Sequence, residues 1–146
     1  MVYSCSTDGK VKAWSITNLQ KKYEYKYEYS CTQSTKVFDI VIGRQGTPLE
    51  NRIVALSQIG CRILNLDTGV EVKKITLDGS CWSITADKAQ TVIAIGTDKN
   101  VTFFETTNFT KVKEVPLKYV YSLAFNERND CMLAVTSGAE VYSFKF

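Results

Sequence analysis

The chain has 146 residues, of which 45% are apolar and 23% charged, and this composition favours a packed core and excludes a disordered chain. The net charge is only +3, so nothing in the composition indicates a strongly basic nucleic-acid domain. The chain contains no histidine, which excludes Ser-His-Asp and Cys-His catalysis and histidine metal ligands.

The cysteines predict a reducing compartment. Their number is odd and no C-x-x-C motif occurs, so neither a disulfide framework nor a zinc site is supported at Cys5, Cys31, Cys61, Cys81 and Cys131. No apolar run reaches the length of a membrane span, and the first residues lack the features of a signal peptide. We therefore expect an intracellular protein, cytoplasmic or nuclear, without a cofactor, metal or membrane contact.

Apolar and polar residues alternate with a period of two along the chain, which predicts an all-β protein. After an apolar start at Tyr3 and Cys5, the predicted strands are, in chain order, 21–29, 37–40, 53–56, 72–77, 81–84, 91–95, 112–117, 120–123 and 131–135. A polar insertion, 44–52, separates two of them, and Pro116 suits an edge strand because it donates no ladder hydrogen bond.

The segment 21–29 has one aromatic and one charged face, because Tyr23, Tyr25, Tyr27 and Tyr29 alternate with Lys and Glu. We favour an outer strand whose tyrosines pack on a neighbouring unit. The alternative is an exposed edge that recruits a strand from another chain.

A four-fold repeat is the most informative feature of the sequence. Each copy has Ser or Thr, an apolar residue four positions later, and a large apolar residue three positions after that. The copies are Thr7–Val11–Trp14, Ser57–Cys61–Leu64, Thr97–Val101–Phe104 and Ser137–Val141–Phe144. Asp8 and Asp98 follow the first residue of a copy, where we expect hairpin turns with positive φ. Four strands in a unit of about 40 residues predict a propeller blade.

These residues resemble the WD-repeat β-propeller family, best in Ser6–Ser15, which is similar to the S-x-D-G-x-V-x-φ-W-D frame. The stretch 96–105 follows the same frame and 64–69 resembles its W-D-φ-x-T-G ending, although no Trp-Asp or Gly-His pair occurs. The resemblance implies an incomplete ring of about three and a half antiparallel blades. Its parts would be an incomplete blade at 1–35, full blades at 36–79 and 80–118, and a terminal blade without its outer strand at 119–146.

Two further expectations follow from the resemblance. The N-terminus would lack two strands while the C-terminus would end naturally, and Thr7, Asp8 and Trp14 would supply three members of the family's buried hydrogen-bond network. Half a ring leaves open faces, so we expect the chain not to be a stable monomer, but to pair with itself or with a second chain.

Three aromatic residues occupy the same register in the predicted inner strands, namely Phe38, Trp82 and Tyr121, and each precedes a small polar residue: Asp39, Ser83 or Ser122. Together with Lys118, they would form a rim that binds a peptide or a partner's loop. The alternative, which we favour, is that the aromatic residues pack between neighbouring blades.

The function that we expect is a non-catalytic protein-interaction scaffold with protein partners. The alternative is a subunit of a ribonucleoprotein or chromatin complex whose basic loops bind nucleic acid or histones, through Lys10, Lys12, Arg44, Lys111, Lys113 and Lys118. An enzyme is disfavoured, because no pair of nucleophile and base is recognisable.

Overall fold

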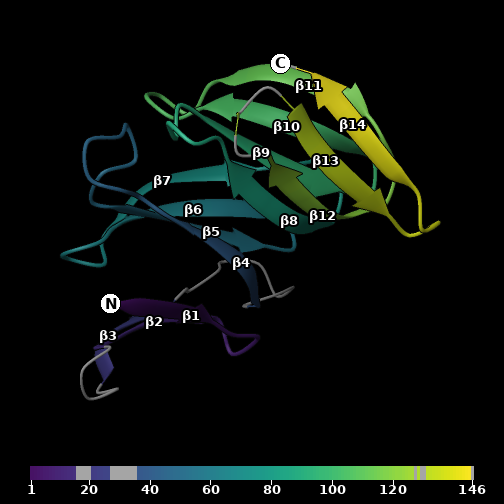
Figure 1. Cartoon of the computed structure of the whole chain (residues 1–146). Coiled ribbons are helices and arrows are strands. Elements are labelled where there is room, and N and C mark those ends of the chain that lie inside the picture. Colours follow the sequence, from purple (N-terminus) through teal and green to yellow (C-terminus); the bar gives the residue numbers. More distant parts are fainter. Residues whose placement is uncertain (16–20, 27–35, 127, 129–130, 146) are drawn as a thin grey trace.

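A computed structural model describes residues 1–15, 21–26, 36–126, 128 and 131–145. These residues form an all-β structure of four antiparallel sheets, and no helix is found among them. In Figure 1 the sheets follow one another in chain order, with β1–β3 at one end of the row and β12–β14 at the other.

Each sheet consists of strands that are consecutive in the chain. The first contains β1 (Val2–Cys5), β2 (Lys10–Trp14) and β3 (Lys21–Lys26). The second contains β4 (Val37–Ile42), β5 (Arg52–Ser57), β6 (Gly60–Asn65) and β7 (Glu71–Thr76). The third contains β8 (Cys81–Ala86), β9 (Val92–Thr97), β10 (Asn100–Glu105) and β11 (Lys111–Pro116). The fourth contains β12 (Val120–Phe125), β13 (Cys131–Thr136) and β14 (Val141–Lys145).

The predicted strands are therefore present in an all-β structure. Pro116 lies at the end of β11, the outermost strand of its sheet, as expected. The strand expected at 21–29 is described over Lys21–Lys26, where Tyr23 pairs with Ala13 and Tyr25 with Val11. Tyr27 and Tyr29 lie outside the described residues.

The equivalent hairpins β1–β2, β5–β6, β9–β10 and β13–β14 come in two lengths. Ser57 pairs with Gly60 across a loop of two residues, and Thr97 faces Asn100 in the same way. In the first and fourth sheets the loop has three residues, so Ser6 N donates to Lys10 O and Thr136 N to Glu140 O. Ser6 and Thr136 consequently hold the position of Ser57 and Thr97, one residue before Thr7 and Ser137 of the sequence repeat.

The turn conformations differ in the same way. The three-residue loops end on Gly9 and Ala139, whose φ values are 80° and 58°. The loop that contains Asp98 has no residue with positive φ, contrary to our expectation. There the Thr97 hydroxyl accepts hydrogen bonds from Lys99 N and Asn100 N, which closes the turn without the left-handed conformation.

Three apolar cores lie between successive sheets. The core between the first and second sheets contains Val11, Val37, Ile53, Ala55 and Leu64. The core between the second and third is the largest and includes Val54, Leu56, Ile63, Ile84, Ile93, Ile95 and Phe104. The core between the third and fourth contains Ala94, Val101, Phe103, Val120, Leu123, Met132 and Ala134. The two middle sheets are thus buried on both faces.

Backbone hydrogen bonds tie each sheet to the next at equivalent places. Val37 N donates to Ser6 O over 3.1 Å, Cys81 N to Gln58 O over 2.8 Å, and Tyr119 N to Asp98 O over 3.2 Å. Val37 and Cys81 are the first residues of β4 and β8, Tyr119 directly precedes β12, and each carbonyl lies in or next to the hairpin of the preceding sheet. The register between neighbouring sheets is therefore set by backbone as well as by apolar packing.

The insertion expected at 44–52 is a loop over 43–51, with Arg52 already in β5. Leu49 is fully buried in the core between the second and third sheets, so the loop is anchored from within. Gln90 of the third sheet anchors it from outside, because its Oε1 accepts from Arg44 N and Thr47 Oγ1, both over 2.8 Å.

In the part of the chain that the structure describes, no helix has the length and apolar character needed to cross a membrane.

Gly96 offers a test of the contact between the third and fourth sheets. A Cβ added at Gly96 would lie 2.7 Å from Cγ1 of Val120 and 3.0 Å from Oγ of Ser83, so Gly96→Ala forces the sheets apart. We expect this overpacking to lower the free energy of unfolding by about 1–3 kcal/mol, measured by urea denaturation. Gly138→Ala is the matched control, since the atoms nearest to a Cβ there lie 3.8 Å away. Equal urea midpoints for the two variants would contradict the packing described.

Candidate functional site

The three aromatic residues singled out in the sequence occupy β-bulges. In β4 the register passes from Val37 opposite Ser57 to Asp39 opposite Leu56, so Phe38 has no partner in the ladder. The same shift leaves Trp82 unpaired in β8 and Tyr121 unpaired in β12. A bulge bends the strand and changes the direction of a side chain. Three equivalent bulges thus present one aromatic side chain from each of three successive sheets.

These side chains form a continuous row, which we call the aromatic row (Phe38, Trp82 and Tyr121). The ring centroids of Phe38 and Trp82 lie 6.2 Å apart, and those of Trp82 and Tyr121 lie 5.4 Å apart in an edge-to-face arrangement. Such distances are typical of attractive aromatic pairs. Trp82 is 36% exposed and Tyr121 is 49% exposed, so the row contacts across sheet boundaries and still faces outward.

The polar residues that follow the aromatic row have three different environments. The Asp39 carboxylate accepts from its neighbour Ile40 N and, across to β8, from Ile84 N over 3.2 Å. Ser83 is buried, and its Oγ has no hydrogen-bond partner in the described structure. Ser122 is exposed. The first two side chains lie between sheets, so of the three only Ser122 is accessible beside the row.

Lys118 is exposed in the loop before β12, two residues from the buried Val120. The adjacent Tyr119, which we did not single out from the sequence, is 52% exposed and has a φ of 54°. A left-handed conformation is unfavourable for a bulky residue and occurs where surrounding contacts impose it. The alternation of Tyr119 with Tyr121 was the available sequence signal for this second exposed aromatic residue.

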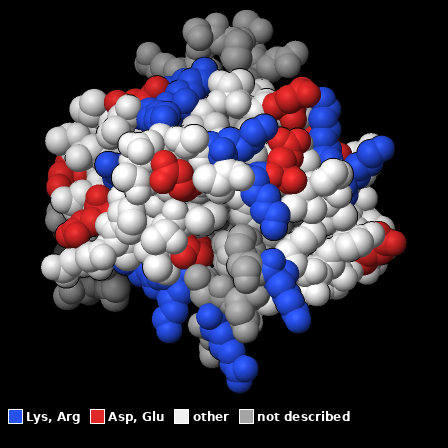
Figure 2. Space-filling view, turned by 90° about the horizontal axis from the view of Figure 1, so that it is seen from above, with Lys and Arg blue, Asp and Glu red and all other residues white. Residues whose placement is uncertain are grey.

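The six basic residues that would bind nucleic acid in the alternative function lie on different sheets and in loops. Lys10 and Lys12 lie on β2, Lys111 and Lys113 lie on β11, and Arg44 lies in the loop after β4. Lys111 forms an ion pair with Glu114, with 2.8 Å between Nζ and Oε2. On the face seen in Figure 2, Lys and Arg side chains are interspersed with Asp and Glu. The six residues do not form one basic patch.

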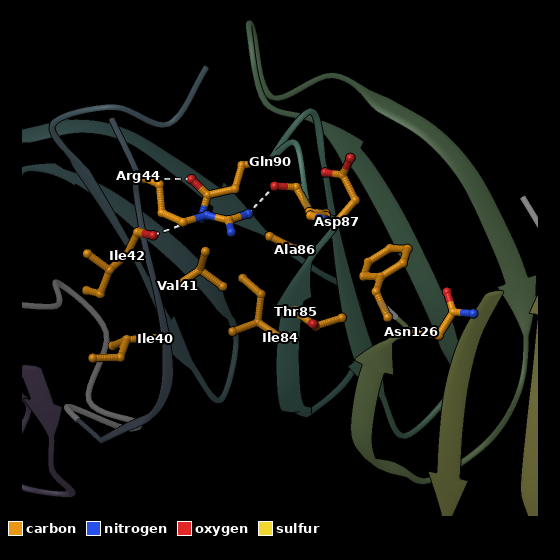
Figure 3. A pocket seen from close by; sticks show the side chains of 12 residues that line it. Ile40, Val41, Ile42, Arg44, Ile84, Thr85, Ala86, Asp87, Gln90 and Asn126 are labelled. Atoms are coloured by element: carbon orange, nitrogen blue, oxygen red, sulfur yellow. Dashed lines mark hydrogen bonds between the residues drawn. The ribbon is translucent and has the colours of Figure 1, made fainter. Parts of the chain in front are cut away.

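A cavity of about 670 Å³ lies at the opposite end of β4, β8 and β12. Ile40, Ile42, Ile84 and Phe125 contribute its apolar lining, from β4, β8 and β12 (Figure 3). The polar groups at its rim form hydrogen bonds within the protein. Gln90 Nε2 donates to Ile42 O, and Arg44 donates to the carbonyl of Lys88.

The acidic residue in the lining of this cavity, Asp87, also has a structural role. Asp87 is buried, and its two oxygens accept from Val92 N over 2.8 Å and from the Thr91 hydroxyl over 2.9 Å. These bonds close the turn between β8 and β9. Within the described residues, no group of three or more Cys, Asp or Glu side chains is placed to hold a metal ion.

The residues of the sequence repeat have structural contacts. Leu64 and Phe104 are buried between sheets, and Phe144 packs against the core of the third and fourth sheets. Trp14 donates from Nε1 to Ser4 Oγ over 3.0 Å, while Asp8 Oδ1 accepts from Lys10 N. These bonds differ from the network expected to join Trp14, Thr7 and Asp8. The extra residue in the hairpin gives Ser6, and not Thr7, the position that Ser57 and Thr97 hold in the second and third sheets.

Buried thiols are the remaining candidate nucleophiles. Burial raises the pKa of Cys81 to about 12, and the charge of Asp98 acts in the same direction. Burial also raises the pKa of Cys61, with a smaller contribution from Cys81. Cys5 is half-buried, and its pKa is raised by burial and by Asp39. Because the thiolate is the reactive form, these three environments suppress nucleophilic chemistry. Cys31 lies outside the described residues.

Comparison with known proteins identifies the fold only. No protein-family model matches the chain, and no curated protein matches its sequence. Among solved structures, the computationally designed Ika4 protein is similar with a TM-score of 0.75 and 15% identity, over 99% of this chain and 84% of that chain. The computationally designed Ika8 protein is similar with a TM-score of 0.73 and 15% identity, over 99% of this chain and 42% of that one.

The buried thiols give a pH-dependent prediction. At pH 9, iodoacetamide should leave Cys61 and Cys81 of the folded protein unmodified and should alkylate them after denaturation, as measured by peptide mass mapping. Because both pKa values are higher in the folded chain, the unfolded chain ionises first, and stability should fall as the pH rises from about 9 towards 12. Rapid alkylation of Cys81 in the native protein would contradict this placement.

Proposed function

We propose that this chain is a non-catalytic protein-interaction scaffold, a partial β-propeller of the WD-repeat type that assembles with itself or with another chain. Four successive antiparallel sheets, each packed on the next, support the propeller arrangement. The frame at Ser6–Ser15 supports the WD-repeat type. In this arrangement β4, β8 and β12 are the inner strands, and they line the centre of the ring.

The observation that carries the proposal is the exposure of the aromatic row. Large aromatic side chains in a sheet ordinarily fill a core, yet Trp82 and Tyr121 remain exposed while they contact each other. Aromatic side chains lose little conformational entropy when they bind, and Trp and Tyr are enriched among the residues that dominate interface energetics. The row is therefore suited to anchor an apolar or aromatic side chain of a peptide or of a partner's loop.

The polar groups of the same strands support a scaffold rather than an enzyme. Asp39 and Asp87 accept backbone amide hydrogen bonds that hold strands and turns, and the buried thiols have raised pKa values. An acid–base catalyst needs a titratable group that reaches a substrate. The carboxylates that line the inner strands instead stabilise the fold.

Selection of peptides from a random phage-displayed library against the immobilised protein tests the proposal. We expect a selected peptide to bind the Trp82→Ala variant about 30-fold more weakly, because truncating an interface anchor typically costs about 2 kcal/mol or more. Fluorescence polarisation of the labelled peptide measures this affinity.

Tyr142→Ala is the matched control, because Tyr142 is 38% exposed on β14, away from the inner strands. Its affinity for the selected peptide should equal that of the unmodified protein. The proposal fails if no sequence is enriched, or if the Trp82→Ala variant binds the selected peptide as tightly as the unmodified protein does.

A further inference from the structure

Each sheet contacts its predecessor through one cross-strand pair at an equivalent position. Ile53 pairs with Leu64 in the second sheet, Ile93 with Phe104 in the third, and Met132 with Phe144 in the fourth. All three pairs pack into the core shared with the preceding sheet. We call the side of a sheet that carries this pair its leading face and the opposite side its trailing face.

The trailing faces are equally regular. Val54 and Leu56 of the second sheet are fully buried against the third, and Ala94 and Val101 of the third are fully buried against the fourth. Each internal contact thus joins the trailing face of one sheet to the leading face of the next. The same kind of apolar contact is formed three times along the chain.

Among the residues that the structure describes, no sheet lies against the trailing face of the fourth sheet. It carries Leu133, Val135 and Val141, which are 43%, 39% and 64% exposed. Val135 pairs with Val141, and Leu133 lies two residues along the same strand, so the three side chains share one side of the sheet. Ser122 pairs with Val135 on that side and is exposed.

Within the described ranges, the leading face of the first sheet is also without a sheet against it. Val2 pairs with Trp14 at the place of the pairs Ile53–Leu64 and Ile93–Phe104. Val2 is 49% exposed and Trp14 is half-buried, whereas Ile53 and Ile93 are fully buried. Ser4 and Lys12, which pair with each other, share this side of the sheet, so Val2 and Trp14 are its large apolar residues. The described chain therefore has one uncovered face on its first sheet and one on its last, and within the molecule a leading face and a trailing face cover each other.

We propose that the trailing face of the fourth sheet of one copy packs on the leading face of the first sheet of a second copy, and that two copies close a ring. This inference rests on the proposed function, of which it names the assembly partner. The contact would repeat the three internal ones, with Leu133, Val135 and Val141 against Val2 and Trp14. Such a contact is heterologous, and it closes a ring when the rotation between subunits permits.

Ring size favours two copies over other numbers. Propellers contain roughly four to eight blades, so two copies with four sheets each reach the upper limit and three copies exceed it. A ring of one copy would bury Val135 and Val2, which are exposed. The fold matches 84% of the Ika4 chain and 42% of the Ika8 chain, so the Ika8 chain, about twice as long, has the length of two units of this size.

Sedimentation equilibrium of the 146-residue chain tests the assembly. The unmodified protein should have twice the monomer mass of 16.4 kDa at micromolar concentration. Val135→Glu and Val2→Glu should each weaken association about 100-fold, because each buries an unpaired charge in the contact. Val112→Glu is the control, since Val112 is 57% exposed on β11 and belongs to neither face. Circular dichroism of each variant verifies that it is folded.

Mixing the variants distinguishes the head-to-tail contact from a symmetric one. The Val135→Glu variant keeps an intact leading face and the Val2→Glu variant an intact trailing face, so an equimolar mixture should form a one-to-one pair through the contact that remains. A symmetric contact between two trailing faces would leave Val2→Glu without effect. Either that result or a monomeric unmodified protein overturns the inference.

The test of the ring of two copies and the test of the proposed function can fail independently of each other. Trp82 belongs to neither open face, so the Trp82→Ala variant should keep the doubled mass. A monomer that still binds the selected peptide through Trp82 would overturn only the ring of two copies. A pair of doubled mass whose peptide affinity is unchanged by Trp82→Ala would overturn only the role of the aromatic row.

Discussion

The burial of both faces of each sheet is the constraint on which the rest of this structure depends. Val54 and Ile53 are neighbours in β5, yet they pack into different cores on opposite sides of the second sheet, and both are fully buried. A sheet with two apolar faces is stable only between two other layers. The four sheets therefore stack in series. The first and last sheets each keep one face that no other described sheet covers.

The stacking brings β4 close to β8 and β8 close to β12. This juxtaposition allows Asp39 of β4 to accept a hydrogen bond from β8, and it places Phe38 beside Trp82 and Trp82 beside Tyr121. Because each aromatic residue sits at a bulge, its backbone has no ladder partner and its side chain leaves the core. The aromatic row is thus a consequence of three equivalent irregularities, brought together by the packing of the sheets.

Much of this arrangement is readable in the sequence, and the differences have local causes. The strands and the common register of the three aromatic residues follow from alternation and from the spacing of the repeats. The repeat frame at Thr7 and Ser137 differs from the structural position by one residue, because two hairpins contain an extra residue that a fixed spacing does not detect. Asp98 likewise lies in a turn without positive φ, since the Thr97 hydroxyl closes that turn by hydrogen bonds that no residue pattern specifies.

The sequence by itself determined the all-β class, the strands and the alignment of Phe38, Trp82 and Tyr121, because these depend on alternation between neighbours along the chain. Tertiary structure decided which of those side chains are exposed, which carboxylates accept hydrogen bonds from backbone amides, and which sheet faces remain uncovered. Leu133 and Ile93 both lie in equally apolar strands, but Ile93 is buried and Leu133 is 43% exposed. The difference arises because burial depends on whether another sheet lies against the face, and a strand's own residues do not contain that information.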